Sequence, residues 1–63
     1  MKTYHAEVVL DGSMWSVRVP EIERTTQART TSEIEPMARD LIAIMEDVPP
    51  DSFLVEVRIR AAA

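Results

Sequence analysis

The chain has 63 residues and a formal net charge of −4, with one histidine and no cysteine. This length predicts one domain, residues 1–63, around a single small core, because short chains bury little of their surface. The composition excludes disulfides and, with one histidine and no cysteine, nearly excludes a structural zinc site. The acidity disfavours direct binding to nucleic acid and favours a basic or neutral protein partner.

The first residues predict no secretion signal. Residues 2–7 are polar, and no apolar run in the chain approaches the length that spans a membrane. We therefore expect a soluble, cytoplasmic protein that has no membrane partner.

Two alternating segments, residues 4–10 and 14–19, predict a β-hairpin. Asp11-Gly12, which contains the only glycine, supplies the turn between them. The side chains expected to point inward are Tyr4, Ala6, Val8, Leu10, Trp15, Val17 and Val19. Pro20 cannot donate to a β-ladder, so it should end the second strand and begin a loop over residues 21–24. Residues 25–30 are rich in threonine and predict a short third strand at the edge of the sheet.

Residues 32–48 predict one amphipathic helix. The apolar residues recur at steps of three and four, and the expected buried stripe is Ile34, Met37, Ala38, Leu41, Ile44, Met45 and Val48. Ala43 should lie on the outer side. Ser32 and Glu35 match a capping box at the start, and Glu35 and Arg39 are spaced for an ion pair on the helix surface. Pro36 is expected at the end of the first turn, and Pro49-Pro50 should end the helix.

The last alternating segment, residues 53–60, predicts a fourth strand with Phe53, Val55, Val57 and Ile59 facing inward. The expected fold class is α+β: a two-layer βββαβ domain with a mixed four-stranded sheet in order 3-2-1-4 and one helix on one face. The helix makes a right-handed crossover that allows the fourth strand to lie parallel to the first. Residues 61–63 are expected to fray.

The sequence offers few residues for chemistry. His5 should lie on the sheet face away from the helix, beside Glu7, with no nucleophile nearby in sequence. The acidic residues are scattered and match no metal-binding loop. Arg58 and Arg60 fit either a phosphate contact or, more simply, the exposed side of a strand. We therefore expect no catalytic residues, no metal, no cofactor and no direct contact with nucleic acid, so the chain should not be an enzyme.

The uncovered sheet face also carries apolar residues, namely Val9, Met14 and Leu54. They are either scattered surface residues or part of a surface that binds a partner protein. In the second case Glu21 and Glu23, in the loop after Pro20, would help to attract a basic partner.

Three segments resemble the N-terminal domain of HicB-type antitoxins. Residues 15–22, WSVRVPEI, match a strand that ends in V-P-(D/E)-(L/I). Residues 26–30, TQART, match the T-x-G-x-T segment that follows, and Ser32-Glu33 matches the acidic start of the helix. The resemblance covers roughly residues 4–46. Ala28 stands where the family commonly has glycine, so a left-handed backbone there would cost about 1 kcal/mol.

This resemblance implies a partial RNase H-like fold without nuclease activity that binds and neutralises a HicA-type toxin, a small basic mRNA interferase. HicB proteins usually continue into a DNA-binding domain, and none follows in this sequence, so operator binding is not expected. The expected function is a non-enzymatic antitoxin module that acts by protein–protein contact. The alternative is a homo-oligomeric accessory or structural domain that has no toxin partner and pairs through its bare sheet face or an edge strand.

Overall fold

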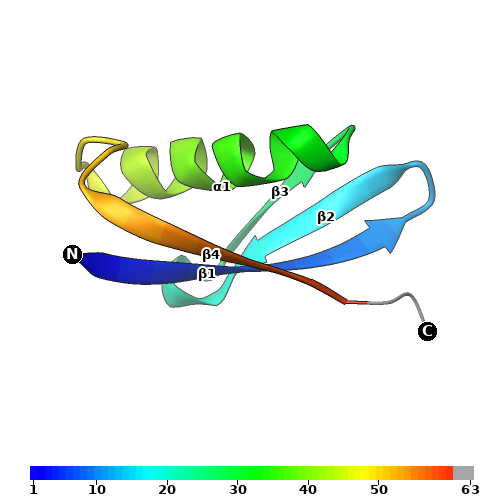
Figure 1. The fold of residues 1–63 in the computed structure, drawn as a ribbon, viewed down its shortest axis with the longest axis horizontal. Helices are drawn as coiled ribbons and strands as arrows, with labels where there is room; N and C mark the ends of the chain where they lie inside the picture. The colour runs from blue at the N-terminus through cyan, green and yellow to red at the C-terminus, as the bar shows by residue number, and fades with distance from the viewer. Residues whose placement is uncertain (61–63) are drawn as a thin grey trace.

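The computed structural model describes residues 1–60, and in this range one α-helix covers one face of a four-stranded mixed sheet (Figure 1). The elements are β1 (Lys2–Asp11), β2 (Met14–Val19), the 3-10 helix η1 (Pro20–Ile22), β3 (Arg24–Ala28), α1 (Thr31–Glu46) and β4 (Phe53–Arg60). The sheet order is β3-β2-β1-β4, with β1 antiparallel to β2 and parallel to β4. This confirms the predicted α+β fold and its strand order. The expected fraying of residues 61–63 lies outside the described residues.

The β1–β2 hairpin forms where the alternation predicts it. Asp11 pairs with Met14, which leaves Gly12 and Ser13 as a two-residue turn, and Gly12 adopts φ 64°. Tight hairpin turns need this left-handed backbone, which glycine adopts without steric cost. Leu10 was expected inside but is 42% exposed, because the end of the hairpin projects past α1 (Figure 1).

Helix α1 begins and ends differently from the prediction. It starts at Thr31, one residue before the predicted start. In the part of the chain that the structure describes, Ser32 and Glu35 do not form the predicted capping box. Instead, the Arg29 N–H donates to the carboxylate of Glu33 at 3.1 Å. The early start moves Pro36 into the second turn, where its ring removes the hydrogen bond that an N–H would donate to the Ser32 carbonyl.

Helix α1 ends at Glu46, two residues before the predicted end, with Asp47 as its C-cap and Pro49-Pro50 shortly after it. Asp47 adopts a left-handed backbone, with φ 55° and ψ 51°, and its N–H donates to the Ala43 carbonyl. The Val48 N–H donates to the same carbonyl at 3.1 Å, which is the pattern of a Schellman motif. This turn brings Val48 back toward Ala43, and both side chains are partly buried. Ala43 was expected on the outer side of the helix, but it is partly buried against the core.

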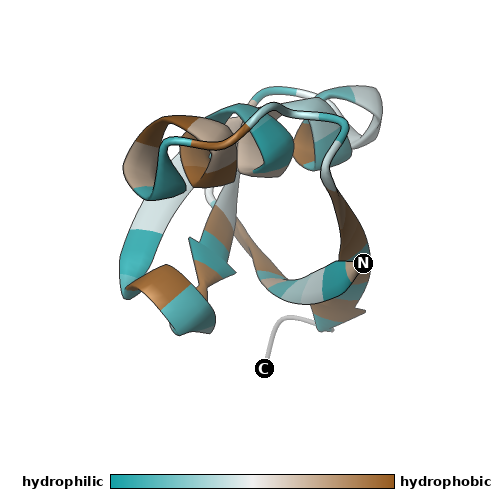
Figure 2. Ribbon diagram, turned by 90° about the vertical axis from the view of Figure 1, so that its left-hand side faces the viewer, coloured by the Kyte–Doolittle hydropathy of each residue, from teal (hydrophilic) through white to brown (hydrophobic). Residues whose placement is uncertain are grey.

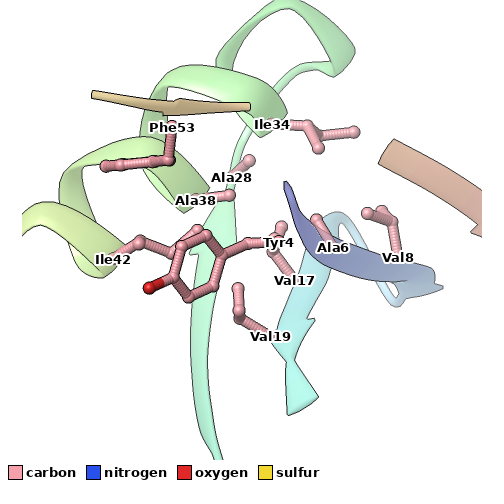
Figure 3. Close-up of a cluster of buried hydrophobic side chains, with 10 residues drawn as sticks. All are labelled: Tyr4, Ala6, Val8, Val17, Val19, Ala28, Ile34, Ala38, Ile42 and Phe53. Atoms are coloured by element: carbon pink, nitrogen blue, oxygen red, sulfur yellow. The ribbon is translucent and has the colours of Figure 1, made fainter. Parts of the chain in front are cut away.

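The core lies between α1 and the sheet (Figures 2 and 3). From α1 it takes Ile34, Ala38 and Ile42, spaced four residues apart. Ile42 was missing from the predicted stripe, yet it is fully buried, whereas Ile44 is 75% exposed. Met37 and Met45 are also more exposed than the prediction required. The buried residues are Tyr4, Ala6, Val8, Val17, Val19, Ala28, Ile34, Ala38, Ile42 and Phe53.

Polar contacts at the β4 side accompany the rotation of α1 away from the predicted face. The Tyr4 hydroxyl donates to the carboxylate of Glu46 at 2.9 Å. Arg39 donates to the Glu35 carboxylate at 2.5 Å, as the spacing predicts, and its guanidinium also lies 5.1 Å from the centre of the Phe53 ring. These contacts bring the Glu35–Arg39–Glu46 side of the helix over β1 and β4, and the opposite apolar side moves toward solvent.

Candidate functional site

The sheet face away from α1 is the candidate site, and we call it the open face. Within residues 1–60, α1 covers one face of the sheet and no second layer covers the other (Figure 2), where only η1 reaches over the edge. Strand alternation and register place on the open face the residues Thr3, His5, Glu7, Val9, Asp11, Met14, Ser16, Arg18, Thr25, Gln27, Leu54, Glu56, Arg58 and Arg60.

The apolar residues predicted to bind a partner do not form one patch. Val9 is 38% exposed and Leu54 is 51% exposed, whereas Met14 is partly buried. In the register, Leu54 lies beside Thr3 and Val9 beside Arg60, so about 20 Å of strand separates the two apolar side chains. Met14 lies near Val9 at the hairpin end. The open face therefore has an apolar residue at each end and charged residues between them.

At the centre of the open face, Glu21 binds His5 through both carboxylate oxygens. The His5 backbone N–H donates to Oε1 at 3.1 Å, and the ring Nδ1 lies 2.5 Å from Oε2. This contact arises because Pro20 ends the ladder: counting on from the Glu7–Arg18 pair puts Pro20 opposite His5. The turn of η1 then brings the next side chain, Glu21, back over β1.

Strand β4 supplies further charges around the imidazole. Glu56 is the register partner of His5, and its carboxylate lies 4.0 Å from Nε2. Arg58 lies two residues further along the strand, with Nη2 3.7 Å from Glu56 Oε1. The four acids Glu7, Asp11, Glu21 and Glu56 thus share the open face with the three arginines Arg18, Arg58 and Arg60. Acids slightly outnumber arginines on this face, and the other acids of the chain lie elsewhere.

These contacts shift the pKa of both members of the His5–Glu21 pair. The hydrogen bond to Glu21 is the main cause that holds the pKa of His5 above 6.5; burial and Arg58 oppose it, and the charges of Glu21 and Glu56 support it. Burial acts to raise the pKa of Glu21, but the hydrogen bonds from the His5 ring and backbone outweigh it and leave this pKa below 4.5. The pair therefore exists as imidazolium and carboxylate in weakly acidic solution.

A pocket of about 250 Å³ adjoins this pair and is lined by His5, Glu7, Pro20 and Arg58. Its lining offers a cation, a carboxylate and an imidazole, but no hydroxyl or thiol nucleophile. The imidazole Nδ1 is engaged by Glu21, and Nε2 is the ring nitrogen left to exchange a hydrogen bond or a proton with a bound molecule. In the part of the chain that the structure describes, no group of three or more His, Cys, Asp or Glu residues is placed to hold a metal ion. This lining can donate and accept hydrogen bonds and can pair with charges of either sign.

The two acidic residues predicted to attract a partner have different surroundings. Glu21 is engaged by His5, and its side chain is 27% exposed. Glu23 is exposed and adopts a left-handed backbone at the end of η1, with φ 51° and ψ 44°. Sequence reasoning placed His5 on the correct face but missed its contact with Glu21. The sequence feature that could have indicated this contact is the acid Glu21, directly after Pro20, the proline that ends β2.

The segments that resemble HicB proteins are regular in the structure. Residues 15–19 lie in β2, residues 20–22 form η1, and Ala28 ends β3. Ala28 is buried and lies in an extended strand, so the predicted cost of a left-handed backbone at this position does not arise. Among residues 1–60, no helix is long and apolar enough to cross a membrane. No family model, no curated protein and no solved structure matches the chain.

Proposed function

We propose that the chain is a non-enzymatic, HicB-like antitoxin module that binds a small basic toxin of the HicA type and neutralises its RNA cleavage by protein–protein contact. The observation that supports this proposal most is the open face, which has apolar side chains among its charges and no covering layer within residues 1–60. The class of partner, a HicA-type toxin, is inferred from the short motifs that resemble HicB proteins. The proposal places the protein in the cytoplasm, where an mRNA interferase would act.

The distribution of charge determines how such a partner would be recognised. Val9 and Leu54 lie at opposite ends of the open face, so a toxin that covers both must also cover the charged residues around His5. Burying these charges is favourable only if the toxin pairs with them. A basic toxin surface can pair with Glu7 and Glu56, and the net charge of −4 attracts it from a distance.

The proposal predicts that a neighbouring reading frame encodes a small basic protein of the HicA type, and it can be tested by assaying that protein for RNA cleavage. We expect the wild-type protein to suppress cleavage at equal concentration, and Leu54→Asp to abolish suppression because it places a new charge in the contact. Ile44→Asp is the matched control, since Ile44 is an exposed apolar residue of α1 on the opposite side of the molecule. Failure of the wild-type protein to suppress cleavage, or equal effects of the two substitutions, would contradict the proposal.

Glu23 gives a second test that leaves the His5–Glu21 pair intact. Glu23→Lys reverses an exposed charge, so it should slow association with the toxin and weaken its dependence on salt, with little change in dissociation. Surface plasmon resonance at several salt concentrations separates the two rates.

The alternative function, a self-associating accessory domain, is favoured by a different observation, the free edge of β4.

A further inference from the structure

The outer edge of β4 is unpaired. Within residues 1–60, β4 pairs only with β1, so the backbone groups on its other side have no strand beside them. At the start of this edge, Arg39 donates Nη1 to the carbonyl of Phe53 at 3.0 Å and also to that of Pro50. The part of the edge that α1 leaves free is therefore residues 54–60, and Val57 is its midpoint.

This free edge lacks the residues that break strands, although Glu56, Arg58 and Arg60 are charged. Residues 54–60, LVEVRIR, contain no proline or glycine. On the side facing α1, Val57 is 37% exposed and Ile59 is 51% exposed, because β4 runs away from the helix toward its end (Figure 1). The other edge of the sheet, β3, is shorter and its exposed residues are polar. The β4 edge is thus the better template for strand addition.

The sequence of the edge is complementary to itself. When two copies pair antiparallel around a two-fold axis, the residues that face each other lie on the same side of the sheet. With the axis at Val57, Glu56 faces Arg58 of the second copy, and Arg58 faces its Glu56. On the other side, Val57 faces Val57, and Val55 faces Ile59. Both salt bridges are formed and the exposed apolar side chains cover one another.

Neighbouring registers lack this complementarity. An axis at Glu56 would set two glutamates opposite each other, and an axis at Arg58 would set two arginines opposite each other. An axis at Ile59 would place Arg58 against Arg60. Like charges directly opposite each other destabilise strand pairing, so charge selects the Val57 register.

We propose that two copies of this chain pair along residues 54–60 of β4, antiparallel and centred on Val57, and form one continuous sheet. The strand order across both copies is β3-β2-β1-β4-β4-β1-β2-β3, with both helices on the same side. The open face of each copy stays accessible, so this pairing does not depend on the proposed antitoxin function. Because one strand from each copy makes a small interface, we expect a dimer that dissociates at micromolar concentrations.

Cysteine substitution tests the register directly, since the chain has no cysteine of its own. Val57→Cys places one thiol opposite its counterpart across the axis, within the Cα separation that a disulfide requires. We expect this variant to form a covalent dimer under mild oxidation. Ile59→Cys is the matched control, because Ile59 faces Val55 and the two new thiols would lie several residues apart along the strands. Equal cross-linking of both variants, or cross-linking of neither, would overturn the proposal.

Charge reversal tests the same pairing without a covalent bond. Arg58→Glu places glutamates opposite each other at two positions, so it should raise the dimer dissociation constant about tenfold or more. Adding Glu56→Arg to Arg58→Glu swaps each pair and should restore dimerisation. Sedimentation velocity from micromolar to submillimolar concentration measures both effects, and circular dichroism confirms that each variant is folded. A wild-type protein that is monomeric throughout this range, or a double variant that stays dissociated, would refute the proposal.

Discussion

Ile42 and Ile44 provide a matched test of the orientation of α1. They are the same residue type, two positions apart in one helix, but Ile42 is 0% exposed and Ile44 is 75% exposed. Ile→Val removes one methyl group and exchanges one β-branched residue for another, so the change in helix propensity is similar at both positions. Any difference between the two variants therefore reports burial.

The expected effect at Ile42 follows from its complete burial. Removing a buried methyl group loses about 0.8 kcal/mol of transfer free energy and leaves a small cavity, and measured Ile→Val costs are about 0.5–1.5 kcal/mol. In a domain of this size, such a loss lowers the melting temperature by roughly 2–12 °C. Ile42→Ala would cost about 2–5 kcal/mol, which approaches the whole stability of about 3–9 kcal/mol expected for this length. Ile42→Val is therefore the more informative variant.

Thermal and urea unfolding followed by circular dichroism measures both variants. We expect Ile42→Val to lower the melting temperature and the urea midpoint, and Ile44→Val to leave both nearly unchanged. If Ile44→Val were the more damaging substitution, α1 would present the face that its periodicity suggests, and the packing described above would be wrong.

Two other features of the structure predict stability changes. Asp47→Gly should stabilise the protein by up to about 1 kcal/mol, because glycine adopts the left-handed backbone at φ 55° without strain and the substitution removes a negative charge from the helix C-terminus. Asp47→Ala should not stabilise it. Unfolding in urea compares the two variants. The His5–Glu21 pair should stabilise the fold most between pH 4.5 and 6.5. The pKa of His5 is raised, so the contribution of His5 is lost as the pH rises through that pKa. The pKa of Glu21 is lowered, so the contribution of Glu21 is lost as the pH falls through that pKa. Melting temperatures of wild type and His5→Gln, measured from below pH 4.5 to above pH 6.5, test the second prediction, which fails if their difference does not vary with pH.

The strands were predictable because each has a simple local signal. The alternation of β1, β2 and β4 specifies their faces, and the turn at Gly12 sets the register of the hairpin. The face of α1 was less predictable, since its apolar residues extend over a wider arc than the sheet covers. The buried part of that arc lies beside the side of α1 on which Arg39 and Glu46 contact distant residues, and periodicity does not report such contacts.

The candidate site was predictable only in part. Strand alternation places His5, Val9 and Leu54 on the open face, but it does not show that Val9 and Leu54 lie at opposite ends of it. The contact between His5 and Glu21 depends on the turn of η1, which the sequence suggested only as a loop after Pro20. Local patterns thus identify the surface, whereas the grouping of its side chains depends on how separate segments meet.

The parallel pairing of β1 with β4 also has a consequence for how the chain folds. Lys2 pairs with Phe53, so the first strand meets the last described one, whereas its hairpin with β2 closes through a two-residue turn. Loop-closure entropy favours the hairpin as the early event and delays the β1–β4 contact. Until β4 docks, Phe53 is missing from the core and one edge of β1 is open to pairing with other chains. A growing polypeptide therefore cannot complete this sheet until β4 has been synthesised.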